Sequence, residues 1–327
     1  MKLISHYRDN DHLRISFIEL AREIFGINFS SWHEKGFWNN RYIPYSYAVG
    51  NKIVANASVN ELDFIIEGYS CRALQIGTVM THPDYRSKGL SANLMNHILE
   101  EYEGKYDFMY LFANNSVLDF YPKFGFERVE ETLYTVKFAS GFEAGSQNTV
   151  NQSSGTIRGS QDSVNHSSGS AEDSKYASDS SEKGLRKLDI SNTEDLQLVE
   201  KIVSERMSVS KIFGTANSGG ITMYHVLNVF TEALYYSEQE DAVVIFLKEN
   251  GTVHLIDIIS RAPVSMEGIF AAITDIETCK IVFHYTPDYK GLEYSLSPYK
   301  REGALFVKTN GGLAFPRHVK HPVTSEA

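Results

Sequence analysis

A serine-rich segment at residues 140–183 interrupts this chain of 327 residues and limits its fold more than any other feature. It holds 13 serines and few side chains that a core could bury. Burial of so little apolar surface cannot offset the entropy lost on ordering, so we predict a disordered linker. The flanking parts, residues 1–139 and 184–327, each carry enough apolar residues for a core, and we predict two domains.

The composition of the chain argues against several classes of protein, among them nucleic-acid-binding, metal-binding and membrane-spanning proteins. A net charge of −10 has the wrong sign for nucleic acid or anionic lipid, so we expect neither as a partner. The two cysteines, Cys71 and Cys279, lie far apart and outside any Cys/His cluster, which argues against disulfides and a bound metal. The charged N-terminus and the lack of a run of about 18 apolar residues predict a cytoplasmic protein without a membrane span.

Hydrophobic periodicity predicts a mixed α/β sheet in the first part. The expected strands are 2–6, two runs within 47–60, 74–80, 107–113 and 132–138, and the expected helices are 13–25, 91–102 and 116–123. The second part repeats the order strand–strand–helix–strand, which suggests an internal duplication. Its expected helices include 222–236 and 265–274, and its expected strands include 242–247, 252–259 and 279–285.

The residues that carry chemistry lie where a predicted strand leads into an amphipathic helix, at 75–92. The loop Arg86-Ser87-Lys88-Gly89-Leu90-Ser91 opens that helix. The first turn of a helix exposes unpaired backbone N–H groups and the positive end of the helix dipole, which together bind anions such as a pyrophosphate. Gly89 permits close approach of the backbone, and Arg86 and Lys88 add positive charge.

This loop resembles the Arg/Gln-x-x-Gly-x-Gly/Ala phosphate loop of the GNAT acetyltransferases, with Ser91 in place of the last Gly or Ala. A second family signature, Asn-x-x-x-x-x-Tyr-x-Lys-x-Gly-Phe, is intact from Asn115 to Phe126. Residues 184–327 lack both signatures. The whole chain resembles the first two modules of the tandem Eis-type acetyltransferases, so the fold implied is a GNAT domain with a V-split sheet, followed by a degenerate GNAT-like module.

The resemblance implies an acetyl-CoA-dependent N-acetyltransferase that transfers an acetyl group directly to a primary amine. Tyr121 would be the general acid for the leaving thiolate, and a backbone N–H near Val79 or Met80 would stabilise the oxyanion. The residues that would hold the cofactor are Val79, Met80, Thr81, Arg86, Ser87, Lys88, Gly89, Leu90, Ser91, Ala92 and Asn115.

Several alternatives stay open. Tyr121 could be a packing aromatic, and Asn115 could be a helix cap. His82, just after the strand at 74–80, could be catalytic or an ordinary loop histidine. The general base is not evident: acidic residues before the strand at 74–80, a water chain or a carboxylate of the second module could serve. The candidates before that strand are Glu61, Asp63 and Glu67.

The tail KHPVTSEA, which ends at Ala327, is given no role, although the C-terminal carboxylate is implicated in Eis-type enzymes. The net charge favours a cationic amine acceptor, and the oligomeric state is open. The alternative function is a non-catalytic, regulatory acyl-CoA-binding module.

Overall fold

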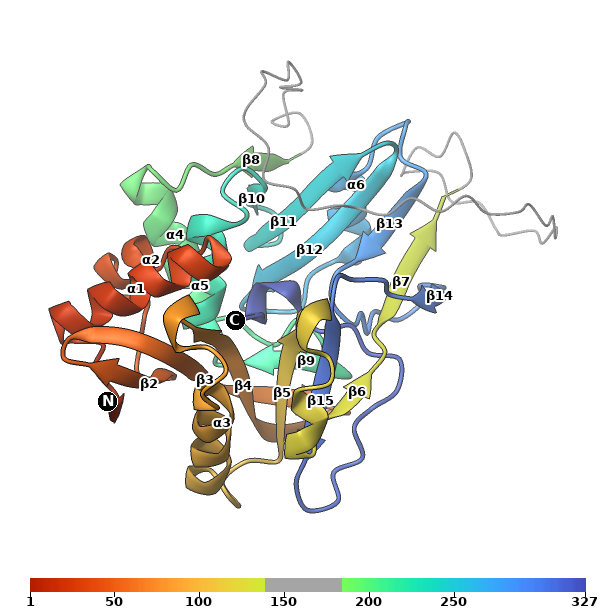
Figure 1. The fold of residues 1–327 in the computed structure, drawn as a ribbon. Helices are drawn as coiled ribbons and strands as arrows, with labels where there is room; N and C mark the ends of the chain where they lie inside the picture. The colour runs from red at the N-terminus through yellow and green to blue at the C-terminus, as the bar shows by residue number, and fades with distance from the viewer. Residues whose placement is uncertain (139–183) are drawn as a thin grey trace.

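The structure is a computed structural model that describes residues 1–138 and 184–327, so the predicted linker at 140–183 lies outside the described residues. Two mixed sheets with helices on their faces make up the described part (Figure 1). The helices are α1 (Asp11–Phe25), α2 (Ser30–Glu34), α3 (Leu90–Glu101), α4 (Thr193–Ser204), α5 (Gly219–Asn228) and α6 (Met266–Ile273). None of these described helices is long and apolar enough to cross a membrane.

The first sheet has the order β1-β2-β3-β4-β5-β15-β6, and β9 pairs with the outer part of β3. Its strands are β1 (Lys2–Ser5), β2 (Tyr42–Val49), β3 (Lys52–Ile66), β4 (Tyr69–Thr81), β5 (Phe108–Ala113), β6 (Glu127–Val129), β9 (Phe213–Ala216) and β15 (Ala304–Thr309). Alternate residues of the strands face opposite sides of the sheet. One face packs against the apolar stripe of α3, and the other packs against α1.

The second sheet has the order β14-β7-β13-β12-β11-β10-β8. Its strands are β7 (Thr132–Lys137), β8 (Leu185–Lys187), β10 (Leu234–Ser237), β11 (Ala242–Glu249), β12 (Thr252–Ser260), β13 (Lys280–Phe283) and β14 (Ser295–Pro298). β12 and β13 are parallel and joined through α6, as β4 and β5 are parallel and joined through α3. The predicted repeat of strand, strand, helix and strand is therefore present in both sheets.

Each sheet takes at least one strand from beyond the segment that we predicted as a domain boundary. From the C-terminal part, β15 lies between β5 and β6 of the first sheet, and β9 pairs with β3. β7, from the N-terminal part, lies between β13 and β14 of the second sheet. The sequence cannot show this exchange, because strand pairing is decided by tertiary contacts and not by the local pattern.

Two predicted helices differ from the structure. The segment 116–123 forms two short 3₁₀ turns, Asn115–Val117 and Tyr121–Phe124, with Pro122 in the second turn. The predicted helix 222–236 ends at Asn228, and the chain continues as β10. Tyr235 and Tyr236 pair with both β11 and β8, and this pairing overrides the apolar periodicity that extended the predicted helix.

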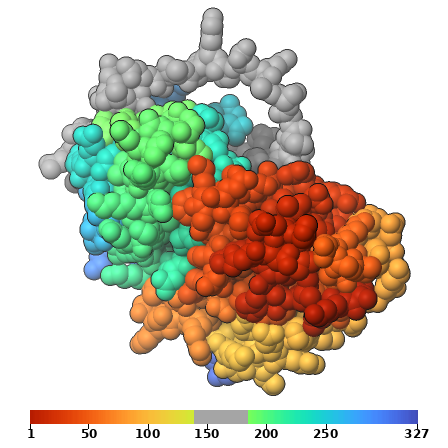
Figure 2. All heavy atoms as spheres, turned by 90° about the vertical axis from the view of Figure 1, so that its left-hand side faces the viewer, coloured from red at the N-terminus to blue at the C-terminus, as the bar shows by residue number. Residues whose placement is uncertain are grey.

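The two halves of the chain pack directly against each other. In Figure 2 the N-terminal part, in red and orange, abuts the green and teal segment that includes α4 and α5. The indole N–H of Trp32 on α2 donates to the carbonyl of Gly220 on α5 at 2.6 Å, and Ser31 donates to Asn228 at 3.0 Å. These bonds join α2 of the N-terminal part to α5 of the C-terminal part.

The C-terminal segment, residues 320–327, runs through the middle of the molecule. Figure 1 places the C-terminus between the two sheets. Lys320, His321, Thr324 and Ser325 have no exposed surface. A segment of polar residues is therefore buried, and its polar groups need partners inside the protein.

Candidate active site

The first sheet splits at the middle of β4. The parallel ladder between β4 and β5 runs from Ala73–Phe108 to Ile76–Leu111 and ends there. Beyond Ile76, β4 continues to Thr81 alongside β3, while β5 pairs with β15. The backbone of 77–81 therefore borders an open wedge, which an extended ligand with amide groups can enter as an additional strand.

An irregularity in β4 shapes the inner end of the wedge. The β3–β4 register shifts between Asn56 and Ser58, and Thr78 has a φ of 49°, in the left-handed region. The side-chain amide of Asn56 donates to the carbonyl of Thr78 at 2.9 Å, and the hydroxyls of Tyr42 and Thr78 lie 2.5 Å apart. These bonds hold a strained residue in place where the strands part, as is common at functional sites.

The predicted phosphate loop lies at the outer end of the wedge. Ser87 and Gly89 both have left-handed backbone, with φ of 59° and 72°. Gly89 precedes α3, and none of the described side chains caps this helix, so the N–H groups of its first turn are available to an anion. A Cβ atom on Gly89 would meet no atom within 4 Å, so the space in front of the loop is open.

A cavity of about 840 Å³ joins the loop to the inner end of the wedge. Ten of the eleven predicted cofactor residues line it: Val79, Met80, Thr81, Arg86, Ser87, Lys88, Gly89, Leu90, Ser91 and Ala92. Tyr121 lines the same cavity and is only 5% exposed. Burial raises the pKa of Tyr121 to about 12, so the phenol keeps its proton at neutral pH.

Comparison with known proteins agrees with this geometry. Residues 10–129 match the family model described as the acetyltransferase (GNAT) domain. These residues form a GNAT domain. A segment of 64 residues is 39% identical to N-alpha-acetyltransferase 50 of Danio rerio and covers 18% of this chain and 38% of that protein.

Two solved structures share the fold over 94% of the chain. One is a probable N-acyltransferase from Enterococcus faecalis V583, with 13% identity, 72% of that chain covered and a TM-score of 0.54. The other is Eis1 from Mycobacterium abscessus, with 11% identity, 74% covered and a TM-score of 0.51. The resemblance of the whole chain to GNAT proteins, with Eis-type proteins among them, is confirmed at the level of fold.

We call the cavity of about 840 Å³ the GNAT cavity, and Asn115 is the predicted cofactor residue that does not line it. Its side-chain oxygen accepts a hydrogen bond from the backbone N–H of Gly303 at 3.2 Å. A Cβ atom on Gly303 would lie 2.1 Å from the carbonyl oxygen of Ala113, so β5 and the start of β15 approach closely here. In the structure the Asn115 side chain therefore links the end of β5 to the start of β15 through a hydrogen bond. Its neighbours Asn114 and Ser116 line the cavity.

The carboxylates that we considered as general bases lie elsewhere. Glu61 accepts a hydrogen bond from the hydroxyl of Tyr102, Asp63 pairs with Arg41 at 3.2 Å, and Glu67 lies in the turn between β3 and β4. None of the three lines the GNAT cavity. Two residues that we left without a role, Glu326 and Ala327, do line it.

A buried ion-pair network, formed by Glu131, Arg301, Lys320 and Glu326, holds the end of the chain at the cavity. Arg301 binds Glu326 through both carboxylate oxygens, at 3.0 and 2.9 Å, and also contacts Glu131 at 3.0 Å. Lys320 donates to Glu131 at 2.9 Å. Burial opposes the ionisation of Glu131, but the charges of Lys320 and Arg301 outweigh it and lower its pKa to about 2. Glu326 is likewise buried, and Arg301 and Lys320 hold its pKa below the ordinary value.

Neighbouring hydrogen bonds complete this arrangement. Thr324 donates to Asp257 on β12 at 2.5 Å, and Ser325 lies 2.7 Å from the hydroxyl of Thr215 on β9. His225 donates from Nε2 to the carbonyl of Glu326 at 2.7 Å. The next residue, Ala327, faces β4, and a Cβ atom on Gly77 would lie 3.0 Å from its carbonyl oxygen. The second module thus places the end of the chain beside the split in the first sheet.

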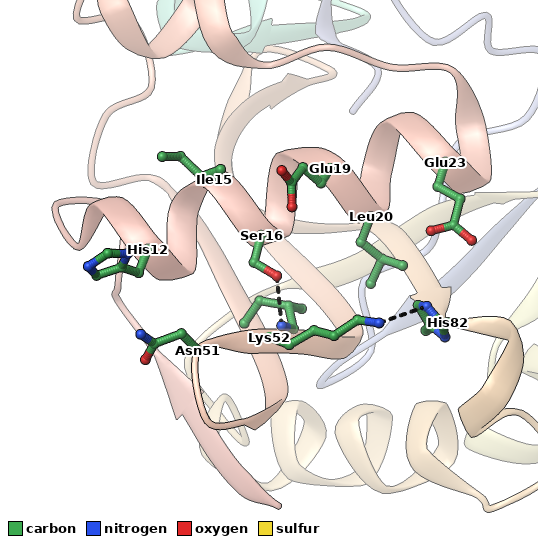
Figure 3. Close-up of a pocket in the computed structure, with 10 residues that line it drawn as sticks. His12, Ile15, Ser16, Glu19, Leu20, Glu23, Asn51, Lys52 and His82 are labelled. Carbon is green, nitrogen blue, oxygen red and sulfur yellow. Dashed lines mark hydrogen bonds between the residues drawn. The ribbon is translucent and has the colours of Figure 1, made fainter.

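A second cavity, of about 500 Å³, lies between α1 and the turn that joins β2 and β3 (Figure 3). His12, Glu19 and Glu23 line it from α1, and Lys52 and His82 line it from the side of the sheet. Lys52 Nζ lies 3.1 Å from His82 Nε2. His82, for which a catalytic role was one reading of the sequence, therefore belongs to this second cavity and not to the cavity that holds Tyr121. The described residues contain no cluster of three or more His, Cys, Asp or Glu side chains that could hold a metal.

Proposed function

We propose that this protein is an acetyl-CoA-dependent N-acetyltransferase that transfers an acetyl group directly to a primary amine within the GNAT cavity. One observation carries the proposal: a single cavity joins an uncapped helix N-terminus, an unpaired strand edge and a buried, protonated tyrosine. These are the three features that an acyl-CoA donor and its leaving thiolate require.

The phosphate loop would hold the pyrophosphate of acetyl-CoA. The backbone N–H groups of 87–92 supply donors, and Arg86 and Lys88 supply charge at the rim. Arg86 donates to the carbonyl of Thr81 at 3.3 Å, and Lys88 to that of Asp84 at 3.0 Å, which keeps both side chains near the loop. The pantetheine arm would lie in the wedge, with its amides paired to the backbone of 79–81.

The transfer would proceed by direct attack of the amine nitrogen on the thioester carbonyl carbon. The N–C bond forms, the carbonyl oxygen gains negative charge, and a backbone N–H near Val79 or Met80 stabilises it. The C–S bond then breaks, and the hydroxyl of Tyr121 gives its proton to the thiolate. Burial raises the pKa of Tyr121, and it also raises the pKa of a thiol in the same cavity. The pKa values of the proton donor and of the thiolate that accepts the proton therefore stay close to each other.

Ordered water would carry away the proton that the amine loses. Gln75 lies two residues before Gly77 on the same face of β4, next to Tyr110 on β5. The rings of Tyr110 and His321 are 4.9 Å apart. The side-chain amide of Gln75, the hydroxyl of Tyr110 and both ring nitrogens of His321 are buried without partners among the described residues. Buried polar groups of this kind are sites for ordered water, and here they adjoin the end of the chain at Ala327.

The proposal is tested with Tyr121→Phe and a matched control, Tyr106→Phe. Tyr106 is 6% exposed in the same core but does not line the cavity. We expect Tyr121→Phe to bind acetyl-CoA normally in calorimetry and to release thiol about 10²–10⁴-fold more slowly in the presence of an amine. Tyr106→Phe should retain wild-type turnover. Wild-type protein that binds acetyl-CoA but acetylates no amine would instead support the regulatory acyl-CoA-binding alternative.

A further inference from the structure

One wall of the GNAT cavity is almost entirely aromatic and aliphatic. We define this acceptor wall by Phe25, Phe29, Tyr42 and Tyr224, which come from α1, the start of α2, β2 and α5. Three isoleucines, Ile24, Ile27 and Ile221, line the same cavity. The wall lies on the α1 side of the sheet, opposite α3, and Tyr42 contacts Thr78 where the strands part.

The acceptor wall is a packed, preformed surface. The ring of Phe29 lies 5.4 Å from that of Tyr224 and 5.9 Å from that of Tyr42. Behind them, Trp32 packs against Tyr42 and Tyr224, with ring centroids 5.2 and 5.8 Å apart. Rings held in this way can receive an apolar ligand without reorganising.

The cavity offers little to a polycation. Among its described lining residues, three side chains carry charge: Arg86, Lys88 and Glu326. The first two are positive and lie at the phosphate loop. The third is bound through both oxygens by Arg301. A ligand with several ammonium groups would lose their hydration without gaining side-chain carboxylates in return. A single ammonium can still be received over aromatic faces.

We therefore propose that the acceptor is a small molecule with one amino group on an aromatic or branched aliphatic body. This inference rests on the proposed N-acetyltransferase function and names the substrate class for the same cavity. The amino group would lie at the inner end of the wedge, beside Thr78 and Tyr121. The apolar body would lie against the acceptor wall, where its transfer from water favours binding.

The test compares amines at saturating acetyl-CoA, with the full chain and thiol release as the readout. We expect phenethylamine or isoamylamine to have kcat/KM at least tenfold higher than spermidine, kanamycin or a short peptide with a free N-terminus. Higher kcat/KM for spermidine, kanamycin or the peptide would overturn the acceptor class and leave the acetyltransferase proposal intact. Binding of acetyl-CoA without transfer to any of these amines would overturn both.

A pair of variants on one helix tests the acceptor wall itself. Phe25, the last residue of α1, is 36% exposed at the cavity, whereas Ile15 on the same helix is 51% exposed in the second cavity. We expect Phe25→Ser to raise KM for phenethylamine at least fivefold, with unchanged affinity for acetyl-CoA, and Ile15→Ser to change neither. Equal effects of the two substitutions on KM would contradict the assignment of the wall.

Discussion

Substitution of Gly89 tests whether the phosphate loop binds acetyl-CoA, because a second glycine with the same backbone conformation, Gly104, serves as a control. Gly89 precedes α3 and Gly104 follows it, and both have a φ of 72°. A Cβ atom on either glycine would meet no atom within 4 Å. Gly89 lines the GNAT cavity and Gly104 does not. The two positions therefore share the backbone strain and the free space but differ in their distance from the proposed pyrophosphate.

We predict that Gly89→Glu and Gly104→Glu lower the free energy of unfolding by similar amounts, about 1–2 kcal/mol, which is the cost of left-handed backbone for a residue with a Cβ atom. They should differ in cofactor binding. A carboxylate about 4–8 Å from a phosphate charge, at an effective dielectric constant of about 20, costs about 2–4 kcal/mol, or about 30- to 1,000-fold in affinity. Only Gly89→Glu should suffer this loss.

The measurements are urea unfolding for stability and calorimetric titration with acetyl-CoA for affinity. Urea curves confirm that both variants are folded before binding is compared. If folded Gly89→Glu bound acetyl-CoA as tightly as Gly104→Glu does, the helix N-terminus would not hold the pyrophosphate. Equal loss of affinity in both variants would show that the effect is general and does not come from the loop.

Two further predictions concern the buried end of the chain. Burial lowers the pKa of His321 to about 4, so the unfolded state takes up a proton near pH 6.5 while the folded state does not. The protonation of His321 should therefore contribute a fall in stability of about 3 kcal/mol between pH 6.5 and 4 in urea unfolding, and His321→Gln should remove this contribution. Arg301→Met leaves the Glu326 carboxylate buried without its bidentate partner, and we expect a loss of about 3–5 kcal/mol together with lower turnover. Added Glu326→Gln should restore part of the stability, and no recovery would contradict the pairing.

The features of the site that are local in sequence could be predicted. The phosphate loop lies between one strand and the following helix, so the spacing of Arg86 and Gly89 already places their backbone at a helix N-terminus. The position of Tyr121 follows from a motif contained within a dozen residues. In both cases the local chain determines the local geometry, and the fold brings the two segments to one cavity.

The features that depend on distant contacts could not be predicted. The tail that begins at Lys320 has the polar composition of an exposed end, yet the Lys320 side chain has no exposed surface. Its ammonium group forms an ion pair with Glu131, which lies 189 residues away in the sequence. The acceptor wall takes Tyr224 from a helix of the second module, which no pattern in the sequence connects to Tyr42. Net charge suggested a cationic amine acceptor without limiting its number of charges, whereas the few charged side chains of the cavity lead us to propose an acceptor with one amino group, because net charge is not the charge of a site.

The central claim is that acetyl-CoA occupies the cavity between β4 and β5 with its thioester at Tyr121. A crystal structure of the full chain with acetyl-CoA tests it most directly. We predict the pyrophosphate on the backbone N–H groups of 87–92, the pantetheine amides along 79–81, and the thioester sulfur within about 3.5 Å of the Tyr121 hydroxyl. Acetyl-CoA bound in the second cavity, beside Lys52 and His82, or a thioester remote from Tyr121, would contradict the account.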